Sequence, residues 1–148
     1  MTPWHLTVDC HDPQRMVAFW SAALGYVPAP PPAGFATWHD WYVSVGVPAD
    51  ELGDGDNCDR LVDPTGVGPR IWFQVVPETK TVKNRLHLDL DVTGGRTTAL
   101  EQRRATVDAK VAELVVAGAQ VLRRADGDTE GHYAATLADP EGNEFCVS

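Results

Sequence analysis

A histidine and an aspartate stand two residues apart in residues 85–92, Arg-Leu-His-Leu-Asp-Leu-Asp-Val. The strict alternation predicts a strand with three leucines on one face and His87 and Asp89 on the other. Leucines on one face require a helix or a core to cover them. An imidazole beside a carboxylate could bind a metal ion, act as an acid or base, or contact only water.

Residues 5–10, His-Leu-Thr-Val-Asp-Cys, resemble this segment and place His5 and Asp9 on one strand face. The similarity continues further along the chain, because Asp-Pro-x-Gly occurs at 63–66 and again at 139–142. Phe73-Gln74-Val75 likewise matches Phe145-Cys146-Val147. Matching pieces in the same order indicate two copies of one supersecondary unit.

Each copy reads as strand, helix and three strands, so the predicted fold is α+β, with two tandem βαβββ modules forming a curled mixed sheet around a cleft. We expect a single domain with module 1 at about 1–76, a crossover at 77–84 and module 2 at about 85–148. Capping residues and apolar spacing predict helices over 13–24, 37–45 and 98–117. The predicted strands are 5–10, 26–28, 60–63, 70–76, 85–92, 120–124, 132–138 and 143–147, with loops at 50–59 and 125–131.

In such a pair of sheets, the start of the first strand and the middle of the last strand of each copy converge. By this reading, the converging residues are His5 and Gln74 from the first copy and His87 and Cys146 from the second. A cleft between the sheets would suit a small molecule.

Composition excludes several classes of partner. The formal net charge is −9, which argues against nucleic acids and anionic membranes. No apolar run approaches the length of a membrane-spanning helix. The three cysteines have no framework spacing, and no signal peptide is evident, so we expect a cytoplasmic protein.

The paired modules, the opening histidines and Asp-Pro-x-Gly-x-x-Phe near the end resemble the vicinal oxygen chelate superfamily. That superfamily includes glyoxalase I, extradiol dioxygenases, and fosfomycin- and bleomycin-resistance proteins. The runs 76–90 and 139–147 are similar to its glyoxalase-like domain subgroup. The resemblance implies a homodimer and one divalent metal ion (Zn, Ni, Mn or Fe) held at His5, His87, Gln74 and Cys146. Gln74 and Cys146 stand where the superfamily usually has carboxylates.

Two functions therefore remain open. One is a metal-dependent lyase, isomerase or dioxygenase in which Asp89 assists as the catalytic base or as a ligand. The other is metal-free sequestration of an aromatic or cationic compound, with Trp72, Trp38, Trp41 and Asp9 contacting that ligand. Equally, the tryptophans could pack only within their own module, Cys146 could be a small buried residue, and a protein partner is a third possibility.

Overall fold

The computed structural model describes residues 2–95, 97–126 and 132–148. The chain divides into two compact units, Met1–Pro77 and Glu78–Ser148, called unit 1 and unit 2 below. The predicted turn at 125–131 lies largely outside the described residues. Its first two residues instead end a strand.

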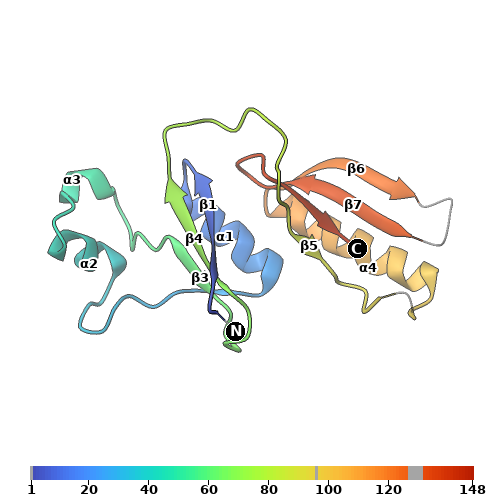
Figure 1. Ribbon diagram of the computed structural model, residues 1–148, viewed down its shortest axis with the longest axis horizontal. Coiled ribbons are helices and arrows are strands. Elements are labelled where there is room, and N and C mark those ends of the chain that lie inside the picture. Colours follow the sequence, from blue (N-terminus) through green and yellow to red (C-terminus); the bar gives the residue numbers. More distant parts are fainter. Residues whose placement is uncertain (1, 96, 127–131) are drawn as a thin grey trace. The chain divides into compact units, whose positions relative to one another are not determined.

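Unit 1 builds a mixed sheet in the order β1-β4-β3-β2, in which β1 and β4 are parallel and the other pairs are antiparallel. Figure 1 shows α1 crossing one side of this sheet. In chain order, the elements are β1 (His5–Cys10), α1 (Pro13–Leu24), β2 (Val27–Pro28), α2 (Trp38–Ser44), α3 (Ala49–Leu52), β3 (Arg60–Val62) and β4 (Arg70–Val75).

Unit 2 repeats the same topology with strand order β5-β8-β7-β6 and a parallel β5–β8 pair. Its elements are β5 (Asp89–Leu90), α4 (Leu100–Val116), β6 (Gln120–Asp126), β7 (Tyr133–Ala138) and β8 (Glu144–Val147). The prediction of an α+β fold with two tandem βαβββ modules is confirmed, and each module carries a four-stranded mixed sheet.

Local sequence signals set the ends of α1 as predicted. Asp12 caps the helix by accepting a hydrogen bond from the Arg15 amide, and Pro13 occupies the first helical position. Gly25 ends it in the left-handed conformation. The buried face of α1 packs on the sheet, so one side of the unit 1 sheet is core and the other, here called the front, is free for other contacts. The fully buried side chains of this core include Met16, Phe19, Leu61 and Phe73.

The helix of unit 2 covers its own sheet in the same way. The spacing of apolar residues in the sequence predicts an inner stripe of Val107, Val111, Leu114 and Val115 on this helix, and the first three are buried. The prediction that Val115 belongs to this stripe is wrong, because Val115 is 46% exposed. It follows Leu114 by one residue, so it points about 100° away around the helix.

The strand predicted over 85–92 is shorter in the structure. Pairing with β8 begins where the Leu88 carbonyl accepts a hydrogen bond from the Cys146 amide, and it ends with the Val92 amide bonded to Ser148. Leu86 precedes the first of these bonds and is 85% exposed, so its predicted place on the core face is wrong. Leu90 is buried as expected.

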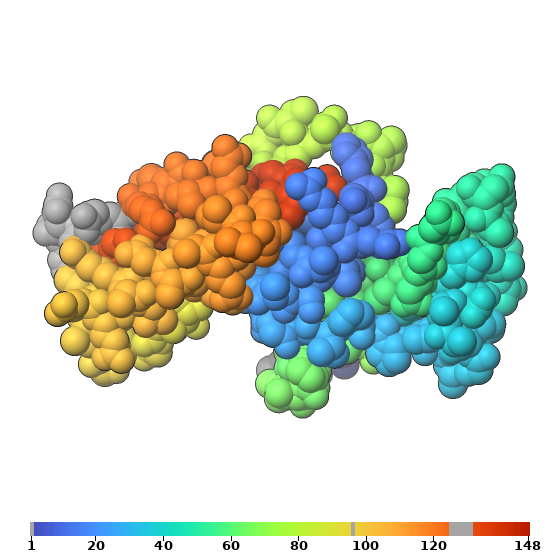
Figure 2. Space-filling model, turned by 180° about the vertical axis from the view of Figure 1, so that it is seen from behind, coloured from blue at the N-terminus to red at the C-terminus, as the bar shows by residue number. Residues whose placement is uncertain are grey.

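The inserted helix α2 begins as predicted, with Thr37 accepting a hydrogen bond from the Asp40 amide. Part of the loop expected at 50–59 is helical instead, because α3 begins after Pro48 and carries two acidic residues in its first turn, where the helix dipole favours them. Together α2 and α3 form a lobe that extends sideways from the sheet of unit 1 (Figures 1 and 2).

The structure also bears on the cysteines and on membrane-spanning segments. The three cysteines are free thiols, with Cys10 and Cys58 buried and Cys146 half-buried. Among the described residues, every helix is too short or too polar to cross a bilayer.

Candidate functional site

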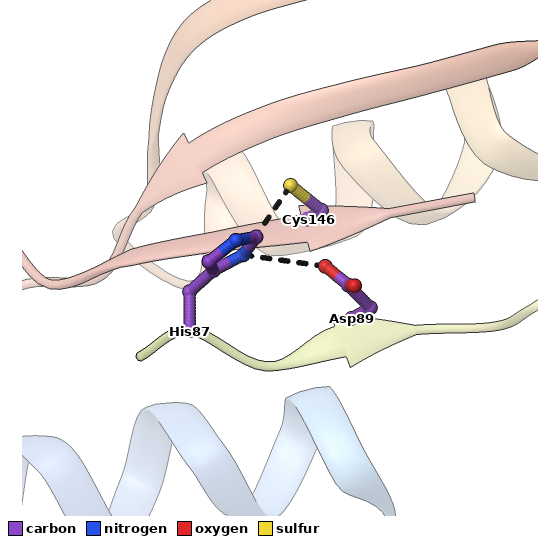
Figure 3. Close-up of side chains that lie close together, drawn as sticks. All are labelled: His87, Asp89 and Cys146. Carbon is purple, nitrogen blue, oxygen red and sulfur yellow. Dashed lines mark hydrogen bonds and ion pairs between the residues drawn. The ribbon is translucent and has the colours of Figure 1, made fainter. Parts of the chain in front are cut away.

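Strand pairing brings three of the predicted site residues together on the front of unit 2. Asp89 of β5 stands opposite Cys146 of β8, and His87 lies two residues before Asp89 on the same side. Figure 3 shows the three side chains converging from β8, from β5 and from the segment that leads into β5. We call His87, Asp89 and Cys146 the triad.

The triad atoms are close enough to share one ion. His87 Nδ1 lies 3.2 Å from Asp89 Oδ1 and 3.7 Å from Cys146 Sγ, and one donor atom from each residue lies within 4.8 Å of the others. Zinc held tetrahedrally at its usual bond lengths would set these separations at about 3.3 Å for nitrogen to oxygen and about 3.6 Å for nitrogen to sulfur. The observed spacing therefore fits a divalent ion, and a thiolate among the donors favours zinc.

The triad is accessible and contributes little to holding the fold. The His87 and Asp89 side chains are 44% and 68% exposed, and exposed ion pairs add little stability. Cys146 also contacts the Thr136 hydroxyl at 3.6 Å. Glu144, two residues before Cys146, pairs with Lys83 at 2.8 Å, which lowers the pKa of its carboxyl and keeps it engaged outside the triad.

The front of unit 1 has different chemistry at the equivalent position. In unit 2, Asp89 lies two positions after His87 and pairs with Cys146. In unit 1, Thr7 lies two positions after His5 and pairs with Trp72. Trp72, and not Gln74, is therefore the counterpart of Cys146, which corrects the sequence alignment of the two copies by two residues. An indole offers no ligand atom to a metal ion.

Gln74 lies further along the sheet. It pairs with Asp9, whereas His5 pairs with Arg70, four residues earlier on both strands. At about 3.3 Å per residue, His5 and Gln74 are roughly 13 Å apart along the strands. Unit 1 thus does not bring these two predicted ligands together.

A buried carboxylate organises the front of unit 1 instead. Asp59 is 8% exposed, and its Oδ2 accepts hydrogen bonds from Tyr42 Oη at 2.6 Å and Trp72 Nε1 at 2.7 Å. Its buried Oδ1 lies 3.0 Å from Arg60 Nε, an ion pair without hydrogen-bond alignment. Burial and the bond to Asp59 raise the pKa of Tyr42, which stays a proton donor.

Arg60 is held over a group of aromatic rings. Its guanidinium carbon lies 4.4 Å from the centre of the Trp38 ring, and 5.7 Å and 5.8 Å from those of Trp72 and Trp41. Trp38 is fixed by a 2.7 Å bond from its indole nitrogen to the Ala29 carbonyl. The sequence analysis named the tryptophans as ligand contacts but missed Asp59 and Arg60. The one sequence signal for these two was an opposite-charge pair directly before the apolar residues of a strand.

This aromatic and arginine group borders a cavity of about 830 Å³ on the front of unit 1. Two of the predicted ligand contacts, Trp38 and Trp72, line it, and so does His5. Trp41 and Asp9 are not among its lining residues. The lining comprises His5, Ala29, Pro30, Pro32, Trp38, Arg60, Leu61, Val62, Asp63, Gly66, Gly68, Arg70, Ile71 and Trp72.

Comparison with known proteins identifies the family of this chain. The sequence pattern of the glyoxalase-like domain matches residues 5–148, which is nearly the whole chain. The chain belongs to the glyoxalase-like domain family. No curated protein sequence matches it significantly.

Solved structures share the fold of this glyoxalase-like protein. A glyoxalase/bleomycin resistance protein/dioxygenase family enzyme from Burkholderia phytofirmans PsJN is 22% identical, with a TM-score of 0.56 over 97% of this chain and 94% of that one. The fosfomycin resistance protein FosX from Listeria monocytogenes is 9% identical, with a TM-score of 0.59 over 99% and 91%. A mutant of that FosX, 10% identical with a TM-score of 0.56 over 97% and 85%, was crystallised with Mn(II) and a dihydroxypropylphosphonic acid.

The family match confirms the resemblance to the glyoxalase-like subgroup of the vicinal oxygen chelate superfamily, and the solved structures share the fold. At these identities they establish the fold and leave the chemistry to the residues of this chain. A metal site shared by His5 and His87, a homodimer and a cytoplasmic location stay predictions.

Proposed function

We propose that this glyoxalase-like protein acts on a small molecule with a divalent ion, preferably zinc, held by the triad of unit 2. The convergence of His87, Asp89 and Cys146 is the observation that supports it. A neutral imidazole, a carboxylate and a thiolate supply two negative charges, enough to offset a divalent cation.

A zinc ion bound with three protein ligands keeps an open position and acts there as a Lewis acid toward a substrate oxygen. The chain's own contribution is to hold the donors. Neighbouring strands fix Asp89 opposite Cys146, and Thr136 contacts the sulfur from the next strand. In this arrangement Asp89 serves as a ligand, and its predicted part as a base would need a conformation in which it leaves the ion.

Metal titration of the purified protein tests the proposal. After stripping with EDTA, the protein should bind one equivalent of Zn²⁺, and Co²⁺ should give a thiolate charge-transfer absorption. His87→Ala and Cys146→Ser should each weaken Zn²⁺ binding at least tenfold, and Cys146→Ser should abolish the absorption. His132→Ala is a matched control, since His132 is an exposed histidine of the same unit.

Failure of the wild-type protein to bind Zn²⁺ at micromolar concentration would overturn the metal site. Activity is the second readout. A hemithioacetal, a catechol and an epoxide represent the substrates of superfamily enzymes, and we expect turnover of one of them to require the metal and to fall with His87→Ala. Metal binding without turnover of any of the three compounds would support the metal site and contradict the proposed activity on such substrates.

Metal-free binding is the second candidate, and one observation favours it. Trp72 stands where unit 2 has its thiol, so unit 1 offers an aromatic wall in place of a ligand atom. A protein that sequesters an aromatic compound would use such walls and would bind its ligand equally well after EDTA treatment. Equal affinity with and without metal, together with no turnover, would select this candidate.

A further inference from the structure

We infer that the front cavity of unit 1 binds a planar aromatic molecule carrying a carboxylate or similar anionic group. The inference concerns unit 1 alone and does not depend on a metal ion in unit 2. The volume of the cavity, about 830 Å³, is within the range of small-molecule sites.

The cavity's tryptophans offer ring surfaces and no free hydrogen-bond donors. The Trp72 indole N–H is bonded to Asp59, and the Trp38 indole N–H is bonded to Ala29. A polar ligand group therefore gains nothing from either indole nitrogen. Trp38 is only 4% exposed and lies beneath Arg60, so the ring face left for a flat ligand is that of the half-buried Trp72.

The Arg60 guanidinium adds a second kind of flat surface. Asp59 pairs with its Nε at 3.0 Å, and its Nη2 donates to the Tyr42 hydroxyl at 3.4 Å. Held by these contacts and stacked on Trp38, the guanidinium stays in one orientation without the ligand. Its charge is largely offset by Asp59, so it favours stacking more than ion pairing.

The remaining charges in the lining favour an anion. Among the lining residues, Asp63 carries the carboxylate, and it already accepts from the Thr65 hydroxyl at 2.7 Å and the Gly68 amide at 2.6 Å. Arg70 also lines the cavity, and within the described part of the chain its guanidinium has no ion pair or hydrogen bond. A guanidinium without a partner matches a carboxylate, which it can bind through two parallel hydrogen bonds.

The opposite strand supplies a second polar contact. His5 pairs with Arg70 across β1 and β4 and lines the same cavity. Its imidazole can donate to an anionic oxygen beside the Arg70 site. The cavity therefore has stacking surfaces at Trp72 and at Arg60, which rests on Trp38, and a polar end at His5 and Arg70.

Three matched probes separate the contributions of ring and charge: 2-naphthoate, 2-naphthamide and 2-naphthylmethylammonium. Binding to EDTA-treated and zinc-loaded protein is followed by the indole N–H signals in NMR spectra. We expect 2-naphthoate to bind about tenfold more tightly than the amide and the ammonium probe to bind most weakly. The shifted signals should include those of Trp38 and Trp72.

Two variants test the assignment to named residues. Arg70→Gln should weaken 2-naphthoate binding about tenfold and leave the amide unchanged, whereas Trp72→Leu should weaken both. Arg123→Gln, which removes an exposed arginine from a strand of unit 2, is the control and should change neither. If Arg70→Gln left the preference for the acid intact, or if the ammonium probe bound as well as the acid, the inference would be overturned.

These outcomes are distinct from those of the metal proposal. Loss of Zn²⁺ binding in the triad variants speaks only to unit 2. The ratio of acid to amide affinity in stripped protein speaks only to the cavity of unit 1.

Discussion

Units 1 and 2 have the same topology but opposite chemistry on their front faces. Both pair the first strand in parallel with the last, and both bury an aromatic or aliphatic row beneath a helix. On the front, unit 2 gathers an imidazole, a carboxylate and a thiol, whereas unit 1 holds indoles and the Arg60 guanidinium around the buried Asp59 carboxylate. The back face is constrained by packing, and the front face was free to diverge because its residues are not needed to form the core.

The largest expected effect tests the shared back face. Ile71 and Phe145 occupy equivalent core positions in the two units and are 4% and 1% exposed. Ile71→Ala and Phe145→Ala should lower the free energy of unfolding by about 2–5 kcal/mol and about 3–5 kcal/mol respectively. Urea unfolding followed by circular dichroism measures both. If either substitution left the free energy of unfolding unchanged, the two core positions would not be equivalent.

The buried carboxylates give the next effect. Asp59 in unit 1 and Asp139 in unit 2 are 8% and 4% exposed. Asp139 accepts bonds from the amides of Glu141 and Asn143. Each Asp→Asn change should cost about 1–3 kcal/mol, since an amide replaces one accepting oxygen with a donor group. Near-ultraviolet circular dichroism should change more for Asp59→Asn, because Asp59 accepts hydrogen bonds from a tyrosine and a tryptophan. Equal spectral changes in Asp59→Asn and Asp139→Asn would contradict this expected difference between the two carboxylates.

Exchanging the thiol of the triad sharpens the difference in front chemistry. Cys146→Asp supplies the hard oxygen ligand that Mn²⁺ prefers. The ratio of Zn²⁺ to Mn²⁺ affinity should fall about tenfold or more, measured by competition with a chelating dye. Cys10→Ala is a thiol control in the other unit. An unchanged ratio would mean that Cys146 does not contact the ion.

The smallest effect concerns the turn at Asp63. Hydrogen bonds, led by that of the Thr65 side chain, lower the pKa of Asp63 to about 2. Because the folded pKa lies below the unfolded value near 3.8, the carboxylate stabilises the fold above pH 4 and loses that effect as the pH falls toward 2. In Asp63→Asn, acid unfolding curves should be flatter between pH 4 and 2. A curve as steep as that of wild type would mean that other titrating groups, and not Asp63, cause the loss of stability in acid.

Much of this fold could be predicted from the sequence because the signals were local. Asp12, Thr37 and Gly25 act as caps within a few residues of themselves. The alternation around Leu90 marks a strand whichever partner it finds. The repeat then gave the order of elements, and the topology followed from it.

The site was harder to predict because it depends on register. Sequence similarity aligned Gln74 with Cys146, while the hydrogen-bonded pairing assigns that place to Trp72. A shift of two residues preserves the alternation of faces, so no hydrophobic pattern reveals it. The Asp59 network was invisible for a related reason: its partners Tyr42 and Trp72 come from a separate helix and strand.

The parallel pairing of β1 with β4, and of β5 with β8, has a consequence during synthesis on the ribosome. The first strand of each unit emerges early, yet its partner is the last strand of that unit. Until that last strand leaves the exit tunnel, the apolar sides of the first strand and its helix have no complete sheet to cover them. Each unit should therefore acquire protection against proteases in a single late step of translation.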